Sequence, residues 1–191
     1  MGRKILLIVD AQNDFVEGGA LAVEGGKGAL IRLTEFIEKH YKEYDGIFLT
    51  ADWHPITHCS FKDNGGIWPT HCVQFSQGAA IFQPILDALD NLKVDYDVLT
   101  KGCDEDHEEY SIFKNATSEA YLKGMNKYNE ISVVDTCGLA GDYCVLDTIK
   151  DGLMTFPNAE FHVIKECVAS IDGGATLNKF IDENERVVCH E

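Results

Sequence analysis

Residues 131–145 read Ile-Ser-Val-Val-Asp-Thr-Cys-Gly-Leu-Ala-Gly-Asp-Tyr-Cys-Val. The first part is a short apolar run typical of a buried strand, and the glycines that follow predict a short loop. The next residues, 142–153, have the length and character of a helix. This order of strand, loop and helix decides the fold because it recurs along the chain.

The alternation of strands and helices extends in both directions from this segment. We expect strands at residues 5–9, 47–50, 97–101, 131–135, 161–164 and 186–189. We expect helices at residues 27–44, 78–89, 118–125, 142–153 and 175–182. Strands separated by helix-length connections cannot pair as hairpins. The sequence therefore predicts a three-layer α/β fold, a mostly parallel central sheet with helices on both faces.

Composition and charge narrow the class of protein. The chain has 191 residues, 45% of them hydrophobic, and no shift in composition, so we expect one domain spanning residues 1–191. The formal net charge of −16 disfavours binding to nucleic acids or to anionic membranes. A small neutral or cationic substrate fits better. No apolar run reaches the roughly 18 residues of a membrane span.

The cysteines and the first residues indicate the compartment. Seven cysteines are an odd number and none forms a Cys-x-x-Cys pair, which argues against a disulfide framework and a thiolate zinc site. The run from Met1 leads into Asp10 and not into a small-residue cleavage site, so it predicts a first buried strand. We therefore expect a cytoplasmic protein.

Polar residues follow four of the predicted strands. Asp10 ends the first strand, Asp52 follows the second, Lys101 ends the third, and Cys144 follows the strand that begins at Ile131. Ligands of such sheets bind at the carboxyl ends of the strands, so these side chains should meet at one edge. Each could instead be structural, with Asp10 capping a loop and Lys101 on the surface. Their joint placement favours a site.

Cys144 is the candidate nucleophile. A cysteine in the first turn of a helix faces the positive end of the helix dipole, which favours its thiolate. The thiol also needs a base, and we expect Asp10 in this role because the histidines near strand ends suit a metal better. Lys101 would supply positive charge. The alternative for Cys144 is a small buried filler, which we expect of Cys137, Cys167 and Cys189.

Asp52, His54 and His71 are the candidate metal ligands. In an extended chain Asp52 and His54 project to the same side, and the loop that follows can bring His71 back to them. Two imidazoles and one carboxylate suit zinc, iron or manganese, with positions left for water or substrate. An Asp-x-His spacing also occurs by chance. His58 is either a fourth ligand or a loop histidine that supports a ligand.

Seven segments of the chain together resemble a known family. They are residues 10–15 (DAQNDF), 18–23 (GGALAV), 52–61 (DWHPITHCSF), 68–73 (WPTHCV), 101–102 (KG), 110–113 (YSIF) and 138–145 (GLAGDYCV). Over about residues 5–175 the chain resembles the nicotinamidases, also called pyrazinamidases, of the isochorismatase-like cysteine hydrolase superfamily. The most specific part is the metal motif combined with Asp10, Lys101 and Cys144, because relatives acting on other amides or on isochorismate generally lack the metal cluster.

The resemblance implies an isochorismatase-like, Rossmann-like fold and hydrolysis of nicotinamide to nicotinate and ammonia, a step of NAD salvage, with pyrazinamide also accepted. Cys144 would attack the carboxamide carbon. Asp10 would take the thiol proton and later pass a proton to ammonia, while Lys101 would keep the pair charged. The backbone N–H groups of Ala140 and Cys144 would form the oxyanion hole, with a cis peptide between Leu139 and Ala140.

The resemblance also implies a pocket and a cofactor. Phe15 and Trp68 would sandwich the pyridine ring, and Tyr110 would close the pocket. The acidic run 104–109 is either a solvated loop or part of the mouth. One divalent ion, zinc before iron or manganese, would hold the ring nitrogen. The partner would be the small-molecule substrate, without nucleic acid or membrane, and homo-oligomer formation stays open.

Two other functions compete with this interpretation. The first is a metal-free cysteine amidase of the same superfamily that acts on a carbamoyl or ureido substrate. The second is a non-catalytic binding module in which Asp52, His54 and His71 hold a structural metal and Cys144 is inert. Metal content and ammonia release from nicotinamide separate the three.

Overall fold

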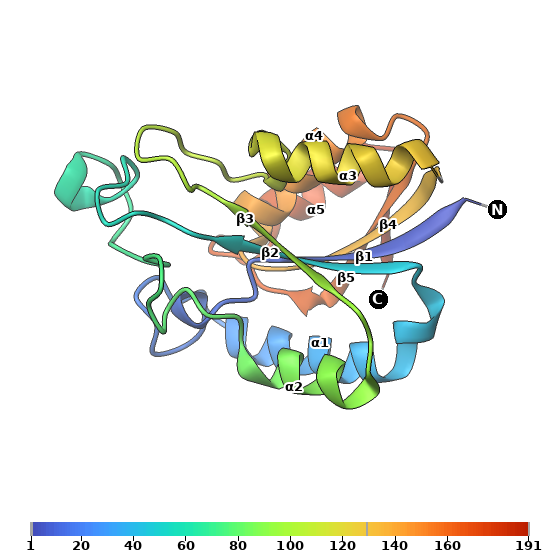
Figure 1. The fold of residues 1–191 in the computed structure, drawn as a ribbon, viewed down its shortest axis with the longest axis horizontal. Helices are drawn as coiled ribbons and strands as arrows, with labels where there is room; N and C mark the ends of the chain where they lie inside the picture. Colours follow the sequence, from blue (N-terminus) through green and yellow to red (C-terminus); the bar gives the residue numbers. More distant parts are fainter. Residues whose placement is uncertain (1, 129, 191) are drawn as a thin grey trace.

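The computed structural model describes residues 2–128 and 130–190 and contains a six-stranded sheet between two layers of helices (Figure 1). All neighbouring strands pair in parallel, in the order β3-β2-β1-β4-β5-β6. The strands are β1 (Arg3–Val9), β2 (Gly46–Asp52), β3 (Asp97–Lys101), β4 (Ile131–Gly138), β5 (Glu160–Val168) and β6 (Val187–His190). The predicted α/β fold is confirmed.

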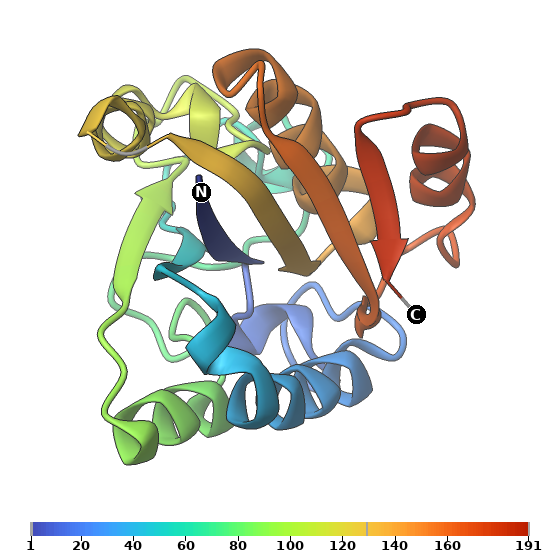
Figure 2. The same cartoon turned by 90° about the vertical axis from the view of Figure 1, so that its right-hand side faces the viewer.

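Helices cover both faces of the sheet (Figure 2). On one face lie α1 (Gly26–His40) and α2 (Gln83–Leu92), and on the other lie α3 (Ala116–Tyr128), α4 (Leu146–Thr155) and α5 (Ala175–Asp182). Strand β1 shows why both faces are needed. Leu6 and Ile8 belong to the core under α1 and α2, whereas Ile5, Leu7 and Val9 belong to the opposite core. Burying each such side chain stabilises the fold by about 1.5–3 kcal/mol.

Two predicted helices have wrong boundaries. The helix expected at 78–89 begins only at Gln83, because the carbonyls of Gly78 and Ala80 accept hydrogen bonds from the backbone of residues 13–14. Pro84 lies in the first turn of α2, where its missing N–H costs nothing. The helix expected at 27–44 ends at His40, and a 3-10 turn follows. Local pattern does not reveal such long-range backbone pairing.

The predicted helix at 142–153 begins with a π-helical turn, Gly141–Val145, before α4 starts at Leu146. Strand β4 is also longer than expected and runs to Gly138, so only two residues separate it from this turn. Gly138 has φ 112°, and a Cβ there would lie 1.9 Å from the Val9 carbonyl oxygen. Only glycine allows β4 to turn this close to β1.

The described parts of the chain give two further findings, on helix length and on the cysteines. Among residues 2–128 and 130–190, no helix combines the length and the apolar character that crossing a bilayer requires. All seven cysteines fall within these ranges, and all are free. A fold without disulfides agrees with the expectation from cysteine spacing.

The carboxyl ends of the strands carry the long connections. Residues 53–82 link β2 to α2, and residues 102–115 link β3 to α3. In Figure 1 both connections extend beyond the same edge of the sheet. Strands β1 and β4 are neighbours, and the connection after β1 leads to β2 on one side, whereas the connection after β4 leads to β5 on the other. Ligands of parallel sheets bind beside such a switch point.

Candidate active site

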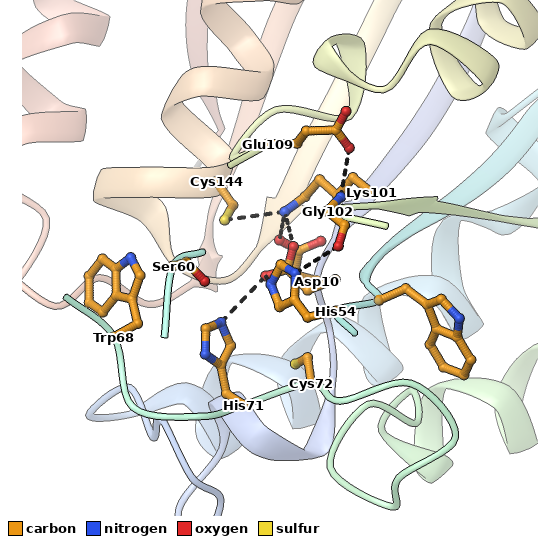
Figure 3. Close-up of polar contacts among 12 residues, drawn as sticks. Asp10, His54, Ser60, Trp68, His71, Cys72, Lys101, Gly102, Glu109 and Cys144 are labelled. Carbon is orange, nitrogen blue, oxygen red and sulfur yellow. Dashed lines mark hydrogen bonds and ion pairs between the residues drawn. The ribbon is translucent and has the colours of Figure 1, made fainter. Parts of the chain in front are cut away.

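Lys101 is the centre of the four polar residues predicted at the strand ends, and Figure 3 shows its ammonium between Asp10 and Cys144. Lys101 Nζ is 2.8 Å from Asp10 Oδ2, 2.5 Å from Asp52 Oδ1 and 3.5 Å from Cys144 Sγ. Lys101 and Asp10 have no exposed surface, and Cys144 is buried. The sheet edge therefore brings an ammonium, two carboxylates and a thiol into one buried cluster.

Asp10 has one carboxylate oxygen anchored and one available. Thr50 Oγ1 donates a 2.6 Å hydrogen bond to Asp10 Oδ1, which fixes the orientation of the carboxylate. Asp10 Oδ2 forms the ion pair with Lys101 but accepts no hydrogen bond of good geometry within residues 2–128 and 130–190. One oxygen of Asp10 lies within 4.8 Å of Cys144 Sγ. This carboxylate can accept the thiol proton.

Burial sets the protonation states of the cluster. It raises the pKa of the Cys144 thiol well above its usual range, although the Lys101 ammonium acts in the opposite direction. Burial also raises the pKa of Asp10, against the lowering effect of Lys101. Burial disfavours charge on Lys101, but Asp10 and Asp52 outweigh this and raise its pKa. Desolvation therefore acts on the pKa of Cys144 in the direction opposite to that expected of a helix start.

Asp52, His54 and His71 form a second group beside this cluster. Asp52 Oδ2 lies 3.6 Å from His54 Nε2 and 3.9 Å from His71 Nε2. His54 Nδ1 lies 2.9 Å from the Gly102 carbonyl, and His71 Nδ1 lies 2.8 Å from the Pro69 carbonyl. Carbonyls only accept, so each Nδ1 carries a proton, and each Nε2 faces Asp52. Metal-binding histidines show this arrangement, and the residues fit a divalent ion.

His58 has both ring nitrogens engaged in other contacts. Nδ1 lies 2.7 Å from Ser60 Oγ, and it accepts a 3.3 Å hydrogen bond from the Ser60 backbone N–H. Nε2 lies 3.1 Å from the His107 carbonyl oxygen and donates to it. Of the two roles left open by the sequence, this geometry favours the supporting one. His58 joins the loop after β2 to the loop after β3.

A cavity of about 390 Å³, counting its open mouth, lies above the cluster. Most of its walls are apolar or aromatic, and they include the three predicted ring-binding residues. The lining residues are Phe15, Leu21, Val23, Asp52, Trp68, His71, Glu108, Tyr110, Ala140, Tyr143, Cys144 and Ile171.

Three aromatic side chains form one wall of the cavity. Trp68 Nε1 donates a 3.0 Å hydrogen bond to Tyr110 Oη, which fixes both rings. The Tyr143 ring meets Trp68 edge to face at 5.0 Å and Tyr110 at 5.5 Å between centroids. Phe15 also lines the cavity, and its ring lies 5.6 Å from that of His71. The walls can hold a flat aromatic ring next to the metal group.

The turn that carries Cys144 contributes two residues to the wall of the cavity. The peptide between Leu139 and Ala140 is cis, as the resemblance implies. The Ala140 carbonyl accepts from the N–H groups of Tyr143 and Val145, both at 3.1 Å. Within the described ranges the Ala140 N–H is used by no hydrogen bond. Ala140 and Cys144 both line the cavity, where such donors can stabilise an oxyanion.

Sequence reasoning assigned no role to several residues that position the site. Gln12 is fully buried, its Nε2 donates to the carbonyls of Asp52 and Ala79, and its Oε1 accepts from the Asp52 N–H, all at 2.8 Å. Asp14 Oδ2 accepts a 2.7 Å hydrogen bond from the N–H of Cys72, next to His71. The polar residues that follow β1, in the sequence 10–14 (DAQND), could have indicated that Gln12 and Asp14 belong to the site. Tyr143 and Ile171 also line the cavity and had no predicted role, whereas Glu108 belongs to the acidic run for which a place at the mouth was one of two expectations.

Comparisons with known proteins agree with this geometry. Residues 4–182 match the isochorismatase domain family. The nicotinamidase of Escherichia coli K12 is 33% identical over 170 residues, covering 80% of this chain and 78% of the relative. A crystal structure of a Pyrococcus horikoshii pyrazinamidase in complex with zinc has a TM-score of 0.82 and 30% identity, covering 99% of both chains.

A second solved structure adds a bound organic molecule. It is the L. infantum protein PnC1 in complex with nicotinate, which has a TM-score of 0.83 and 28% identity, and covers 100% of this chain and 93% of the other. The family match spans nearly the whole chain, and the fold and the clustered motif residues agree with it. The chain therefore belongs to the isochorismatase family, and within it to the nicotinamidases.

Proposed function

We infer that this protein hydrolyses nicotinamide to nicotinate and ammonia through a thioester on Cys144. One observation carries the inference: Lys101 joins Asp10, Asp52 and Cys144 directly beside the His54 and His71 side chains, below a cavity with aromatic walls. The E. coli nicotinamidase and the nicotinate-bound structure support the substrate. Pyrazinamide, a similar aromatic carboxamide, is accepted as well.

The first half-reaction uses Asp10, Lys101 and Cys144. The Cys144 thiol gives its proton to Asp10 as the sulfur attacks the carboxamide carbon and a carbon–sulfur bond forms. Burial raises the pKa of Asp10, so the pKa of the base lies closer to that of the thiol, and this makes the proton transfer easier. Asp10 then gives the proton to the amide nitrogen, the carbon–nitrogen bond breaks, and ammonia leaves. Lys101 compensates the negative charge that moves between sulfur and carboxylate.

The second half-reaction returns the enzyme to its resting state. Asp10, again a carboxylate, takes a proton from a water molecule that attacks the thioester carbonyl. The carbon–sulfur bond breaks, Cys144 recovers a proton, and nicotinate is released. In both halves the N–H groups of Ala140 and Cys144 donate to the developing oxyanion. Each such donor typically contributes about 3 kcal/mol to lowering the barrier.

The ring is held by the aromatic walls and by the metal group. Phe15, Trp68 and Tyr110 line the cavity. We propose that they contact the ring and so orient the carboxamide toward Cys144. Asp52, His54 and His71 would hold one divalent ion. We propose zinc, supported by the zinc complex of the Pyrococcus horikoshii relative. When bound, the ion supplies a Lewis acid for the pyridine nitrogen.

Ammonia release from nicotinamide tests the activity. We expect turnover by the zinc-loaded protein, loss of turnover after chelation, and recovery after zinc is restored. A metal-free amidase predicts no bound metal, unchanged turnover after chelation, and ammonia from a carbamoyl or ureido substrate instead. A non-catalytic module predicts no ammonia from either substrate. Absence of ammonia from nicotinamide with fully zinc-loaded protein would contradict the assignment.

Two further properties remain proposals. We propose that residues 1–191 act as one domain, supported by the single six-stranded sheet. We also propose a cytoplasmic location, supported by seven free cysteines, three of which are only partly buried or exposed: Cys59, Cys103 and Cys189.

A further inference from the structure

The turn that follows β3 uses the two polar backbone groups of Gly102 in opposite directions. Gly102 comes directly after Lys101, and its φ of 61° lies in the left-handed region that favours glycine. Its N–H donates a 2.6 Å hydrogen bond to Glu109 Oε2, and its carbonyl oxygen lies 2.9 Å from His54 Nδ1. In Figure 3 dashed lines run from Glu109 to Gly102 and from Gly102 to His54. One glycine therefore links Glu109 to the metal group.

The sheet topology explains why a side chain is needed here. Within residues 2–128 and 130–190, β3 is an edge strand that pairs only with β2. The Lys101 carbonyl faces β2 and accepts a 2.9 Å hydrogen bond from the Trp53 N–H. The N–H of the same peptide belongs to Gly102, and in a trans peptide it points the opposite way, beyond the edge of the sheet. Glu109 supplies the acceptor that a further strand would otherwise provide.

The start of α3 holds Glu109 in this place. Asn115, the residue before α3, donates a 3.1 Å hydrogen bond from Nδ2 to Glu109 Oε2, and its Oδ1 accepts one of 3.1 Å from the Ser118 N–H. Ser118 Oγ in turn donates a 3.0 Å hydrogen bond to the Thr100 carbonyl. This network begins and ends at the last residues of β3. It fixes the carboxylate from the side opposite to Gly102.

The Gly102 carbonyl determines how the His54 ring is oriented. It accepts from Nδ1, and Nε2 then faces Asp52 Oδ2 at 3.6 Å. The ring and the turn are in close contact, since a Cβ on Gly102 would lie 2.3 Å from His54 Cε1. A hydrogen-bond partner of this kind orients a metal-binding histidine. If the Gly102 N–H lost its acceptor, the turn could shift and the His54 ring would move with it.

We propose that Glu109 is a positioning residue for the metal group. It holds the peptide between Lys101 and Gly102, so that the Gly102 carbonyl orients His54. The inference rests on the metal group of the proposed function. Glu109 acts through Gly102, and it is assigned no contact with the ion or the substrate. The position requires a hydrogen-bond acceptor, so a neutral amide oxygen should serve as well as a carboxylate.

Zinc affinity of the purified full chain tests the proposal, measured by competition with a chromophoric chelator. Glu109→Ala removes the acceptor, and Glu109→Gln keeps an oxygen in its place. Glu105→Ala is the matched control, because Glu105 is an exposed residue of the same loop. We expect Glu109→Ala to weaken zinc affinity by about tenfold, as loss of an outer-shell partner typically does. Glu109→Gln and Glu105→Ala should stay within about twofold of the wild type.

Two further readouts distinguish positioning of His54 from a general loss of stability. The visible absorption of the cobalt-saturated protein reports the geometry of the ligands, and we expect it to change in Glu109→Ala alone. A residue that only stabilised the loop would lower the unfolding temperature and leave this spectrum as in the wild type. Amide exchange of Gly102 in the metal-free protein reports the hydrogen bond itself. It should be faster in Glu109→Ala and as slow as in the wild type in Glu109→Gln.

Three results are decisive. Wild-type zinc affinity and an unchanged cobalt spectrum in Glu109→Ala would overturn the proposal. Equal losses of zinc affinity in Glu109→Ala and Glu109→Gln would also overturn it, because charge and not the hydrogen bond to Gly102 would then be responsible. Zinc binding by a wild type that releases no ammonia from nicotinamide would contradict the proposed reaction and leave the positioning role of Glu109 standing.

Discussion

Two buried charged clusters lie on the same sheet and differ in what they leave unbalanced. At the carboxyl edge, Lys101 is paired with two carboxylates, Asp10 and Asp52, and all three are buried. Further along β4, Asp135 alone receives Lys4 at 3.0 Å, the Tyr44 hydroxyl at 2.6 Å and His162 at 3.1 Å. In the first cluster two carboxylates share one ammonium, which leaves negative charge in excess. In the second cluster three groups, Lys4, Tyr44 and His162, contact one carboxylate.

The difference in charge helps to distinguish a catalytic cluster from a cluster that only stabilises the fold. Lys4 and His162 offset the charge of Asp135, and the Lys4 side chain is 30% exposed, so solvent screens this cluster. The Lys101 cluster is buried and holds a thiol beside its two carboxylates. Among the described residues each cluster leaves one carboxylate oxygen without a hydrogen bond, Asp10 Oδ2 and Asp135 Oδ1, so the thiol and the excess of carboxylates distinguish the first cluster. A buried cluster that needs a proton, a cation or a substrate to complete it is a candidate for chemistry.

We expect the largest difference in turnover between a variant that lacks the Cys144 thiol and one that lacks the Tyr44 hydroxyl. Cys144→Ala deletes the nucleophile, so we expect ammonia release from nicotinamide to fall by a factor on the order of 10⁴ or more. Tyr44→Phe deletes the hydroxyl on Asp135 and should leave turnover within about twofold while costing about 0.5–1.5 kcal/mol of stability. Kinetics and urea unfolding measure the two effects.

The expected zinc content of Cys144→Ala equals that of the wild type, because the sulfur is not among the proposed ligands. Cys189→Ala, at a partly buried cysteine of β6, is the matched control and should keep full activity. Substantial turnover by Cys144→Ala would contradict the nucleophile assignment, and the Lys101 cluster would then have no demonstrated catalytic role.

The same substitution of the two lysines should separate the clusters by stability. Lys101→Met leaves two buried carboxylates without their cation, so we expect a loss of about 3–5 kcal/mol and no measurable turnover. Lys4→Met removes a partly exposed ammonium and should cost at most about 1 kcal/mol. Urea unfolding at pH 7 checks both values. Equal losses of unfolding free energy in the two variants would contradict the expectation that only the Lys101 cluster depends on its cation.

A backbone change can disturb the catalytic cluster alone. Gly102 has φ 61°, and a Cβ there would lie 2.3 Å from the His54 ring. We expect Gly102→Ala to displace His54 and to weaken zinc affinity by about tenfold or more. Gly173→Ala is the matched control, since Gly173 has φ 72° but nothing within 4 Å of its Cβ position. Both variants bear the cost of a left-handed alanine, of about 1 kcal/mol or more.

Zinc titration and thermal unfolding of the two glycine variants separate the effects. Stability should fall in both, whereas metal affinity should fall only in Gly102→Ala. If Gly173→Ala lost as much metal affinity, backbone strain and not the displaced His54 would be responsible.

The smallest effect concerns the pH dependence of the Asp135 cluster. The hydrogen bond to Asp135 raises the pKa of His162, although burial opposes it. His162 therefore stabilises the fold fully below its unfolded pKa of about 6.5, and this contribution is lost as pH rises through the folded value. Burial alone would raise the pKa of Asp135, but His162, Tyr44 and Lys4 lower it, so its contribution is lost in acid.

The difference in stability between His162→Gln and the wild type should therefore depend on pH. We expect the difference in unfolding free energy to be largest between about pH 4 and pH 6.5 and to shrink toward pH 9. Turnover of His162→Gln should follow the wild-type pH profile, since His162 lies away from the cavity. A constant difference in stability across this range would show that His162 is not charged in the native state.

Much of the architecture could be predicted because the local pattern and the fold agree. The apolar run of β1 is hydrophobic at every position from Ile5 to Val9, as both faces of a parallel sheet require, and the strand at Asp97–Lys101 and the helix at Ala175–Asp182 have the predicted bounds. The start of α2 was predicted too early, because the backbone of Gly78 and Ala80 pairs with a loop more than sixty residues away.

By itself, the sequence determined the parallel sheet, the four polar strand ends and the metal-type spacing, since periodicity and topology send those residues to one edge. The tertiary structure decided what each group meets there. Burial raises the pKa of Cys144, against the direction expected of its helix start. The packing of two distant loops brings Glu108 into the cavity and engages both nitrogens of His58. Desolvation and loop contacts depend on three-dimensional neighbours, which no local pattern encodes.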